Sequence, residues 1–257
     1  MKGTFVREKV KVELKNPILI EGLPGLGMVG KIAIRYLAGQ LKAKKFAELY
    51  SPFFPYYVVV NRKGGVRLLC GNFYLWKNET GENDLILLTG DSQAQTIEGQ
   101  YEVSDYILNF AEGHGVKTVI TVGGYRQEAE KTPKVVAVAT SGELLNKALQ
   151  AGALLSPAGN PIVGMAGLIL GLARFKNLHA LCLLGETRGY LSDPLATKSV
   201  LNVLQRLLGI QINLSGLDEE IARSKEIVER MQKIEEQREV QTRRMRKAEE
   251  ERMTYIS

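Results

Sequence analysis

The sequence is poor in the residues that build metal sites and disulfide frameworks. Its 257 residues include only two histidines, His114 and His179, and two cysteines, Cys70 and Cys182. A zinc site needs at least three converging protein ligands, so these few scattered residues predict no metal site. Both cysteines lie in apolar runs, which favours buried thiols in a reducing compartment over disulfides. We expect a cytoplasmic protein without a bound metal or cofactor.

Long hydrophobic runs are also missing. The longest, Ile162 to Ala173, is too short to cross a bilayer, and the segment Met1 to Arg7 contains no apolar signal core. The formal net charge is +6, but no run of basic residues is interleaved with aromatic side chains on one face. These patterns predict a soluble protein that binds neither membranes nor nucleic acid.

The segment 218–257 lacks both proline and glycine. It contains 10 Lys or Arg and 11 Asp or Glu, and opposite charges three and four residues apart stabilise a solvated helix. Helically spaced apolar residues are confined to its proximal half and the residue just before it: Leu217, Ile221, Val228 and Met231. We expect these four to pack on the body or on a partner helix, the alternative being an ordinary solvated or frayed terminus. The prediction is an α/β core and oligomerisation domain over 1–217 and a long charged helix and tail over 218–257.

Within residues 1–217, short β-rich runs alternate with segments of helical periodicity. The predicted strands are Ile18–Glu21, Val58–Asn61, Val66–Gly71, Leu85–Thr89, Thr118–Val122, Val135–Ala139 and Leu178–Leu184. The predicted helices are Met28–Leu41, Thr96–Glu112, Gly142–Gln150, Gly164–Arg174 and Pro194–Leu208. This alternation predicts a three-layer α/β/α sandwich with a mostly parallel sheet. The turn from Arg62 to Gly65 predicts an antiparallel hairpin, so we expect the sheet to be mixed.

A glycine-rich turn follows the first body strand. Gly25, Gly27 and Gly30 fit the spacing of a dinucleotide fingerprint in the strand, turn and helix context that this motif requires. The acid expected about twenty residues later has only Glu48 as a candidate, and Ile32 stands where a phosphate loop carries Ser or Thr. Glycines also let a helix pack close to a strand. We therefore favour tight packing over nucleotide binding at this turn.

Polar residues follow the ends of three other predicted strands, where open α/β sheets place their ligand crevice. Asp91, Arg126 and Glu186 hold such positions, and with the three glycines they outline a pocket. Asp91 and Glu186 are candidates for an acid and a base, and Arg126 is a candidate for binding an anion. A hydrolase or phosphorylase activity is therefore an alternative function. No nucleophile is paired with a base, so we favour a vestigial pocket without catalytic residues.

The order of several short segments resembles a known family. These segments are Gly22–Lys31, Asp91–Gln93, Gly123–Tyr125, Gly159–Gly164, Glu186–Thr187 and Asp193–Pro194. Together they resemble the archaeal proteasome-assembly chaperone homologues, which belong with the eukaryotic second proteasome assembly chaperone in one family. The resemblance implies a nucleoside-phosphorylase-like α/β/α fold without established catalysis. It also implies a homo-oligomeric core, a tetramer or pentamer, with C-terminal helices that approach the proteasome.

In that family a C-terminal hydrophobic-Tyr-any tripeptide is associated with binding between the α-subunits of the proteasome. This chain ends Met253-Thr254-Tyr255-Ile256-Ser257, so Tyr255 is third from the end rather than second. Thr254 stands where the family pattern has a hydrophobic residue. These five residues form the candidate partner-binding site, in a register that departs from the family pattern.

Two functions follow from these observations. The first is a proteasome-assembly-chaperone-like or proteasome-binding protein, in which a homo-oligomer presents helical arms to proteasome α-subunits or the 20S proteasome. The second is a nucleotide- or nucleoside-binding enzyme, an ATP-grasp-like ligase or a phosphorylase-like protein, that uses the crevice. We favour the first and expect no enzymatic activity, because no catalytic site in the sequence is complete.

Overall fold

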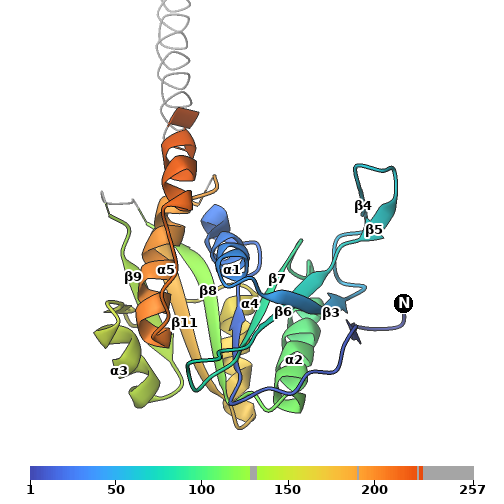
Figure 1. The fold of residues 1–257 in the computed structure, drawn as a ribbon, viewed down its shortest axis with the longest axis horizontal. Coiled ribbons are helices and arrows are strands. Elements are labelled where there is room, and N and C mark those ends of the chain that lie inside the picture. The colour runs from blue at the N-terminus through green and yellow to red at the C-terminus, as the bar shows by residue number, and fades with distance from the viewer. Residues whose placement is uncertain (128–131, 190, 225, 228–257) are drawn as a thin grey trace, which may run out of the picture. The chain divides into compact units, whose positions relative to one another are not determined.

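A computed structural model describes residues 1–127, 132–189, 191–224 and 226–227 (Figure 1). The chain divides into two units, Met1–Leu214 and Ser215–Ser257. Residues 216–224 and 226–227 of the second unit are helical. The rest of the predicted C-terminal helix, from residue 228 onward, lies outside the described residues.

A nine-stranded sheet forms the centre of the first unit (Figure 1). Its strands in spatial order are β1 (Phe5–Glu8), β3 (Lys44–Tyr50), β6 (Gly71–Trp76), β7 (Leu85–Gly90), β2 (Ile18–Glu21), β8 (Thr118–Arg126), β11 (His179–Thr187), β9 (Val135–Ala139) and β10 (Leu154–Leu155). The central strands β7, β2, β8 and β11 run parallel. On one flank β1, β3, β6 and β7 pair antiparallel, and on the other β11 pairs antiparallel with β9. The sheet is therefore mixed around a parallel centre.

Helices cover both faces of this sheet. They are α1 (Val29–Gln40), α2 (Ile97–Gly113), α3 (Gly142–Gln150), α4 (Met165–Leu172) and α5 (Pro194–Leu208), with short 3-10 turns η1 (Leu26–Met28) and η2 (Ala173–Phe175). α1 packs beside α5, and α2 packs beside α4. Successive side chains of β2 lie on opposite faces of the sheet. Leu19 belongs to the hydrophobic cluster that includes residues of α2 and α4, whereas Ile20 is fully buried but is not part of that cluster. The alternation produces the three layers that the sequence predicted.

Aromatic side chains attach α2 to the antiparallel flank of the sheet. The ring centroid of Phe110 in α2 lies 4.5 Å from that of Phe73 in β6 and 6.2 Å from that of Phe46 in β3. Phe73 is completely buried and Phe46 nearly so. Burial of such side chains contributes about 1.5–3 kcal/mol each, so this cluster is a main source of stability on the flank.

Side-chain caps fix where three of the helices begin. Thr96 accepts from the amide of Gly99 at 3.0 Å at the start of α2, and Asp193 accepts from the amide of Ala196 at 2.9 Å at the start of α5. Ser141 has the same role before α3. Each cap satisfies an amide that has no partner inside its helix. The predicted starts of α2, α3 and α5 agree with the structure within one residue, as these capping residues lead one to expect.

One predicted strand joins two observed ones, the predictions for β8 and β11 end too early, and four strands, β1, β3, β6 and β10, were missed. Val66–Gly71 is not continuous, because β5 (Val66–Leu68) ends before the buried pair Leu69 and Cys70, and β6 begins at Gly71. The predicted hairpin is confirmed as β4 (Val58–Val60) paired with β5, but it forms a separate two-stranded sheet. The strands β1, β3 and β6 on the antiparallel flank were not predicted.

Candidate functional site

The glycine-rich turn packs against the carboxyl ends of the central strands. A Cβ atom at Gly30 would lie 2.2 Å from the carbonyl oxygen of Val122, so α1 and β8 touch through their backbones. Gly27 has a φ of 59°, and a Cβ there would lie 2.5 Å from the hydroxyl of Thr187. Gly25 has more room, with its nearest neighbour, the Gln93 amide, 3.6 Å away. Gly27 and Gly30 therefore serve close packing of the chain on itself.

Neighbouring loops hold the turn by hydrogen bonds. Nε2 of Gln93 donates to the carbonyl of Pro24 at 2.7 Å, and Oε1 of Gln93 accepts from the amide of Met165 at 3.0 Å. The amide of Asp193 donates to the carbonyl of Gly27 at 2.8 Å. The loops after β2, β7 and β11 and the start of α4 thus join one another at the edge where a doubly wound sheet ordinarily binds its ligand. The bridging role of Gln93 was missed by the sequence analysis, because nothing in its spacing marks a side chain that bonds at both ends.

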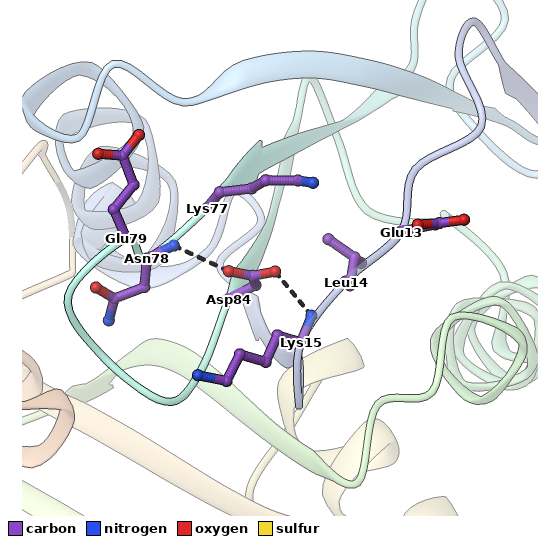
Figure 2. Close-up of a pocket in the computed structure, with 7 residues that line it drawn as sticks. All are labelled: Glu13, Leu14, Lys15, Lys77, Asn78, Glu79 and Asp84. Atoms are coloured by element: carbon purple, nitrogen blue, oxygen red, sulfur yellow. Dashed lines mark hydrogen bonds between the residues drawn. The ribbon is translucent and has the colours of Figure 1, made fainter.

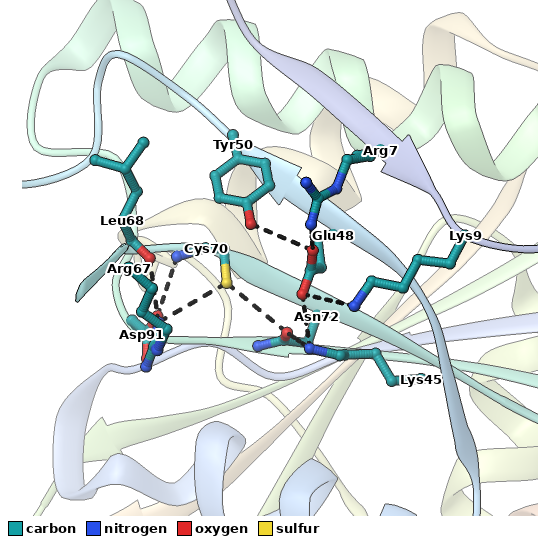
Figure 3. Close-up of polar contacts among 10 residues, drawn as sticks. All are labelled: Arg7, Lys9, Lys45, Glu48, Tyr50, Arg67, Leu68, Cys70, Asn72 and Asp91. Atoms are coloured by element: carbon teal, nitrogen blue, oxygen red, sulfur yellow. Dashed lines mark hydrogen bonds and ion pairs between the residues drawn. The ribbon is translucent and has the colours of Figure 1, made fainter. Parts of the chain in front are cut away.

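Asp91, which directly follows β7, is part of an ion pair (Figure 3). Its carboxylate accepts from the guanidinium of Arg67, with one N–O distance of 3.0 Å, and from the amide of Cys70 at 3.0 Å. Burial raises the pKa of Asp91, but the bonds from Arg67 and Cys70 outweigh it and hold the pKa below its usual value. A carboxylate held ionised in this way is a poor general acid. Its structural effect is to join the β4–β5 hairpin to β7.

Two buried carboxyl groups at this edge have incomplete hydrogen bonding. Oε2 of Glu186 accepts from the amide of Lys134 at 2.9 Å, and its Oε1 has no partner within the described part of the structure. Oε1 of Glu21 accepts from the amide of Leu23 at 3.1 Å, and its Oε2 is likewise without a partner there. Burial raises the pKa of Glu21 to about 8, so this acid is mostly protonated at neutral pH.

Glu21 was not predicted as a site residue, although its sequence context contains one signal. An acid that ends an otherwise apolar strand, Ile18 to Glu21, is expected to be buried wherever both faces of that strand are covered. The structure buries Glu21 to 1% exposure. This burial is the main cause of the raised pKa of Glu21.

The predicted pocket residues Asp91, Arg126 and Glu186 lie at or next to the ends of three different strands, β7, β8 and β11. Arg126 is exposed at the end of β8, and a Cβ on the neighbouring Gly189 would lie 3.9 Å from its Nε. Among the residues that the structure describes, no hydrogen bond or ion pair joins Asp91 to Glu186. The six residues predicted as a vestigial pocket therefore lie in the loops and strand ends along one edge of the sheet, and their role as a pocket stays a prediction.

Two surface cavities lie away from this edge. One, of about 390 Å³, lies at the amino ends of β2 and β7, and Figure 2 shows Asp84 at its centre. The Asp84 carboxylate accepts from the amides of Lys15 at 2.8 Å and Asn78 at 2.9 Å, so it joins two loops. The other cavity, of about 500 Å³, is lined by the end of α5 and the residues that follow it to Ile212. Neither cavity contains a residue predicted as functional.

A second polar cluster surrounds Glu48, the residue considered above as a ribose-binding acid (Figure 3). Three cations donate to its carboxylate: Lys45 at 2.7 Å, Arg7 at 2.7 Å and Lys9 at 3.1 Å. The bond from Lys45, with those from Lys9 and Arg7, lowers the pKa of Glu48 to about 2 against the opposing effect of burial. The cluster links β1 to β3 and carries a net positive charge. It lies on the antiparallel flank rather than at a nucleotide-binding strand end.

The predicted tail residues divide between described and undescribed parts of the chain. Leu217 is fully buried and Ile221 is 9% exposed. Val228, Met231 and the candidate partner-binding residues 253–257 lie outside the described residues. Within the described ranges, no group of three or more His, Cys, Asp or Glu residues is arranged to hold a metal ion. The helices described there include none that is long and apolar enough to span a membrane.

Two proteins of Methanocaldococcus jannaschii resemble this chain over most of their length. The uncharacterized protein MJ1210 is 36% identical over 236 residues, which covers 91% of this chain and 90% of the relative. The uncharacterized protein MJ0106 is 27% identical over 252 residues, covering 97% of both chains. The similarity therefore extends over the whole sheet and into the second unit.

Solved structures extend the comparison to the fold. Pyrococcus furiosus PbaB, described as an archaeal proteasome activator, matches with a TM-score of 0.86 and 37% identity, covering 90% of this chain and all of PbaB. Pyrococcus furiosus PbaA, described as an archaeal homolog of proteasome-assembly chaperone, matches with a TM-score of 0.74 and 28% identity, covering 95% and 98%. The model of the PAC2 family matches residues 19–233. The chain therefore belongs to the PAC2 family.

Proposed function

We propose that this protein is a proteasome-binding protein of the assembly-chaperone type, with a homo-oligomeric core that presents C-terminal helical arms to proteasome α-subunits. The observation that carries the proposal is the 37% identity and TM-score of 0.86 to PbaB over 90% of the chain. The similarity to PbaA, an archaeal homolog of proteasome-assembly chaperone, supports the same reading. The partner is then a proteasome subunit rather than a small molecule.

The geometry of the carboxyl edge favours this role over a nucleotide- or nucleoside-binding enzyme. The turn that would cradle a phosphate packs against Val122 and Thr187, and Gln93 joins it to the start of α4. Asp91, a candidate acid, is bound to Arg67. A ligand at this edge would have to displace contacts that the chain already makes with itself, which costs affinity.

The tail composition supports the role of an arm. Residues 218–257 contain 10 basic and 11 acidic residues without proline or glycine, which is typical of a solvated helix. Several arms on one oligomer bind together, and linked weak contacts gain about 10²–10⁴ in avidity when their geometry allows simultaneous engagement. A weak contact through the terminal residues around Tyr255 is then sufficient.

Native mass spectrometry of the protein mixed with proteasome α-subunits tests this function. We expect a complex with the full chain and none with a chain truncated after Ile227, which keeps the buried residues Leu217 and Ile221. Within the full chain, Tyr255→Ala should weaken binding at least tenfold, whereas the matched control Met245→Ala in the same tail should not. Undiminished binding by the truncated chain would refute the arm as the binding element.

A further inference from the structure

The β4–β5 hairpin has two very different faces. Figure 1 shows it standing away from the nine-stranded sheet, and its register pairs Val58 with Leu68, Val59 with Arg67 and Val60 with Val66. Side chains paired across an antiparallel ribbon point to the same face, and successive side chains alternate. Val59 and Arg67 therefore form one face, and the other four residues form the opposite face. We call the second set the outer face: Val58, Val60, Val66 and Leu68.

The first face attaches the hairpin to the body. Val59 packs against the hydrophobic core beneath it, and Arg67 pairs with Asp91 after β7. The buried residues Leu69 and Cys70 continue the chain from β5 into the main sheet. Because these contacts hold the ribbon from one side, the orientation of its outer face relative to the body is set.

The outer face is apolar and uncovered. Val60 and Val66 are 65% and 66% exposed, and Leu68 is 50% exposed. Tyr56 and Tyr57, just before β4, are exposed as well. A hairpin on the surface of a monomer ordinarily directs its polar side chains outward and its apolar ones inward, and this hairpin places its charge, Arg67, on the side toward the body.

The exposed area has the size of a specific interface. The four residues of the outer face are 47–66% exposed, and Tyr56 and Tyr57 before it are 103% and 60% exposed. With about 150–250 Å² for a whole aromatic side chain and somewhat less for an aliphatic one, the six residues expose on the order of 700 Å² in all. A standard protein interface takes about 800 Å² from each partner. Contiguous apolar patches of this size on a soluble protein usually mark a contact with another protein.

We propose that the outer face is a self-association surface, on which the hairpin of a second copy of this chain packs face to face about a two-fold axis. The outer face is uncharged, so it offers no charge pattern that selects a differently charged partner. A two-fold contact covers the same patch on both copies at once, and a flat ribbon of aliphatic side chains is complementary to itself. The area available from each copy is close to the roughly 800 Å² that a standard interface takes from each partner.

The charges at the tip of the hairpin set the direction of the two ribbons. Arg62 and Lys63 lie in the turn between β4 and β5 and are exposed. Antiparallel packing keeps these cations of the two copies apart, whereas packing in the same direction brings them together. The tip residue Val60 of one copy then lies near the base residue Leu68 of the other. The self-association contact rests on the proposed function only for its purpose. That purpose is to gather several C-terminal arms on one assembly.

Light scattering of the full chain with substitutions on the outer face tests the proposal. Val60→Asp and Val66→Asp should each reduce the molar mass of the assembly to half or less, with an unchanged circular dichroism spectrum. The matched control is Val163→Asp, because Val163 is 88% exposed and lies in the loop before α4, outside the hairpin. An unchanged mass for both hairpin variants, or a wild-type chain that is monomeric at micromolar concentration, would overturn the proposal.

Cysteine cross-linking tests the face-to-face geometry without disturbing the apolar surface. A mixture of Val60→Cys and Leu68→Cys chains should form a disulfide-linked dimer on mild oxidation, and more of it than Val60→Cys alone. The native thiols Cys70 and Cys182 are buried, so they contribute little background. No excess of the mixed dimer over the single variant would refute the antiparallel contact.

The two proposals fail in distinguishable ways. If wild-type chains bind no α-subunit but Val60→Asp lowers the mass, the self-association surface stands and the proteasome function falls. If wild-type chains bind α-subunits and truncation after Ile227 lowers the mass while Val60→Asp does not, the tail assembles the copies and the hairpin proposal falls. A Val60→Asp chain that keeps its mass but loses α-subunit binding would assign the outer face to the proteasome instead of a second copy.

Discussion

Gly30 of α1 lies so close to Val122 of β8 that a Cβ atom on the glycine would come within 2.2 Å of the carbonyl oxygen of Val122. That oxygen belongs to a central strand and cannot move without disturbing the sheet. We expect Gly30→Ala to destabilise the fold by about 1–3 kcal/mol, the usual cost of overpacking.

The matched control for Gly30 lies in the same helix. Gly39 is exposed, and a Cβ there would meet nothing within 4 Å. Gly39→Ala should therefore be neutral or stabilise by up to about 1 kcal/mol, because alanine favours helix. Urea unfolding of both variants measures the difference. Equal stabilities would show that the backbone contact at Gly30 relaxes without cost.

The buried acid Glu21 predicts an unusual dependence of stability on pH. Burial raises its pKa in the folded protein from 4.5 to about 8, so the folded state holds a proton that the unfolded state releases above pH 4.5. The contribution of this group to stability is present below that value and is lost as the pH rises toward 8, by about 1.4 kcal/mol per pH unit. Glu21→Gln keeps the shape and removes the titration.

Urea unfolding between pH 5 and pH 9 checks this prediction. The wild type and Glu21→Gln should have similar stability near pH 5, and the variant should become the more stable of the two by pH 8. Parallel curves for the two proteins across this range would mean that Glu21 keeps an ordinary pKa in the fold.

Glu48 predicts the opposite dependence. Its pKa of about 2, lowered chiefly by the bond from Lys45, means that the carboxylate stabilises the fold above pH 4.5 and loses this effect as the pH falls toward 2. Glu48→Gln should cost about 1–3 kcal/mol at pH 7, since hydrogen bonds to charged groups are lost. The cost should shrink at pH 3 and in high salt.

Glu143→Gln is the control for Glu48, because its ion pair with Lys147 is fully exposed to solvent and should contribute little. Stability should be measured by thermal or urea unfolding, because guanidinium chloride is a salt and would itself screen the ion pairs. A cost for Glu48→Gln that does not change between pH 7 and pH 3 would argue against the ionised cluster.

The ion pair between Arg67 and Asp91 should control local order in the hairpin more than overall stability. Arg67 is half exposed, and such pairs contribute less than about 1 kcal/mol. Arg67→Met keeps the aliphatic stem and removes the charge. We expect faster amide hydrogen exchange in residues 58–68 with a nearly unchanged midpoint of unfolding.

The comparison variant for Arg67 is Arg62→Met, which alters an exposed cation at the tip of the same hairpin. Its exchange pattern should match the wild type. Unchanged exchange in residues 58–68 of the Arg67 variant would show that Val59 alone holds the ribbon to the body.

The parallel centre of the fold was predictable because each of its strands is a short apolar run followed by a turn signal. Ile18–Glu21 and Leu85–Gly90 are buried on both faces, and a continuous hydrophobic pattern is what such strands require. Capping residues such as Thr96 and Asp193 made the helix starts visible. These features are local, so periodicity and end signals were sufficient.

The antiparallel flank was not predictable by the same means. β3 begins with two lysines and contains Glu48, so its hydrophobic pattern is interrupted. The cations that pair with this buried acid include Arg7 from β1 and Lys9 just after it. The role of Gln93 likewise depends on Pro24 and Met165, which are distant in sequence. Both features arise from contacts that only the folded chain brings together.

The register shift between Lys45 and Ala47 lets one short strand serve two purposes. Phe46, which lies within the shift, enters the aromatic cluster under α2. Ala47, the first residue after it, enters the same core, while Lys45 and Glu48 meet on the opposite side. An insertion or deletion of one residue here would exchange the two surfaces of the strand, sending the carboxylate inward and a hydrophobic side chain outward. Length variation at this position is therefore the change that the flank tolerates least, and point substitutions of the exposed Lys44 should be far better accepted.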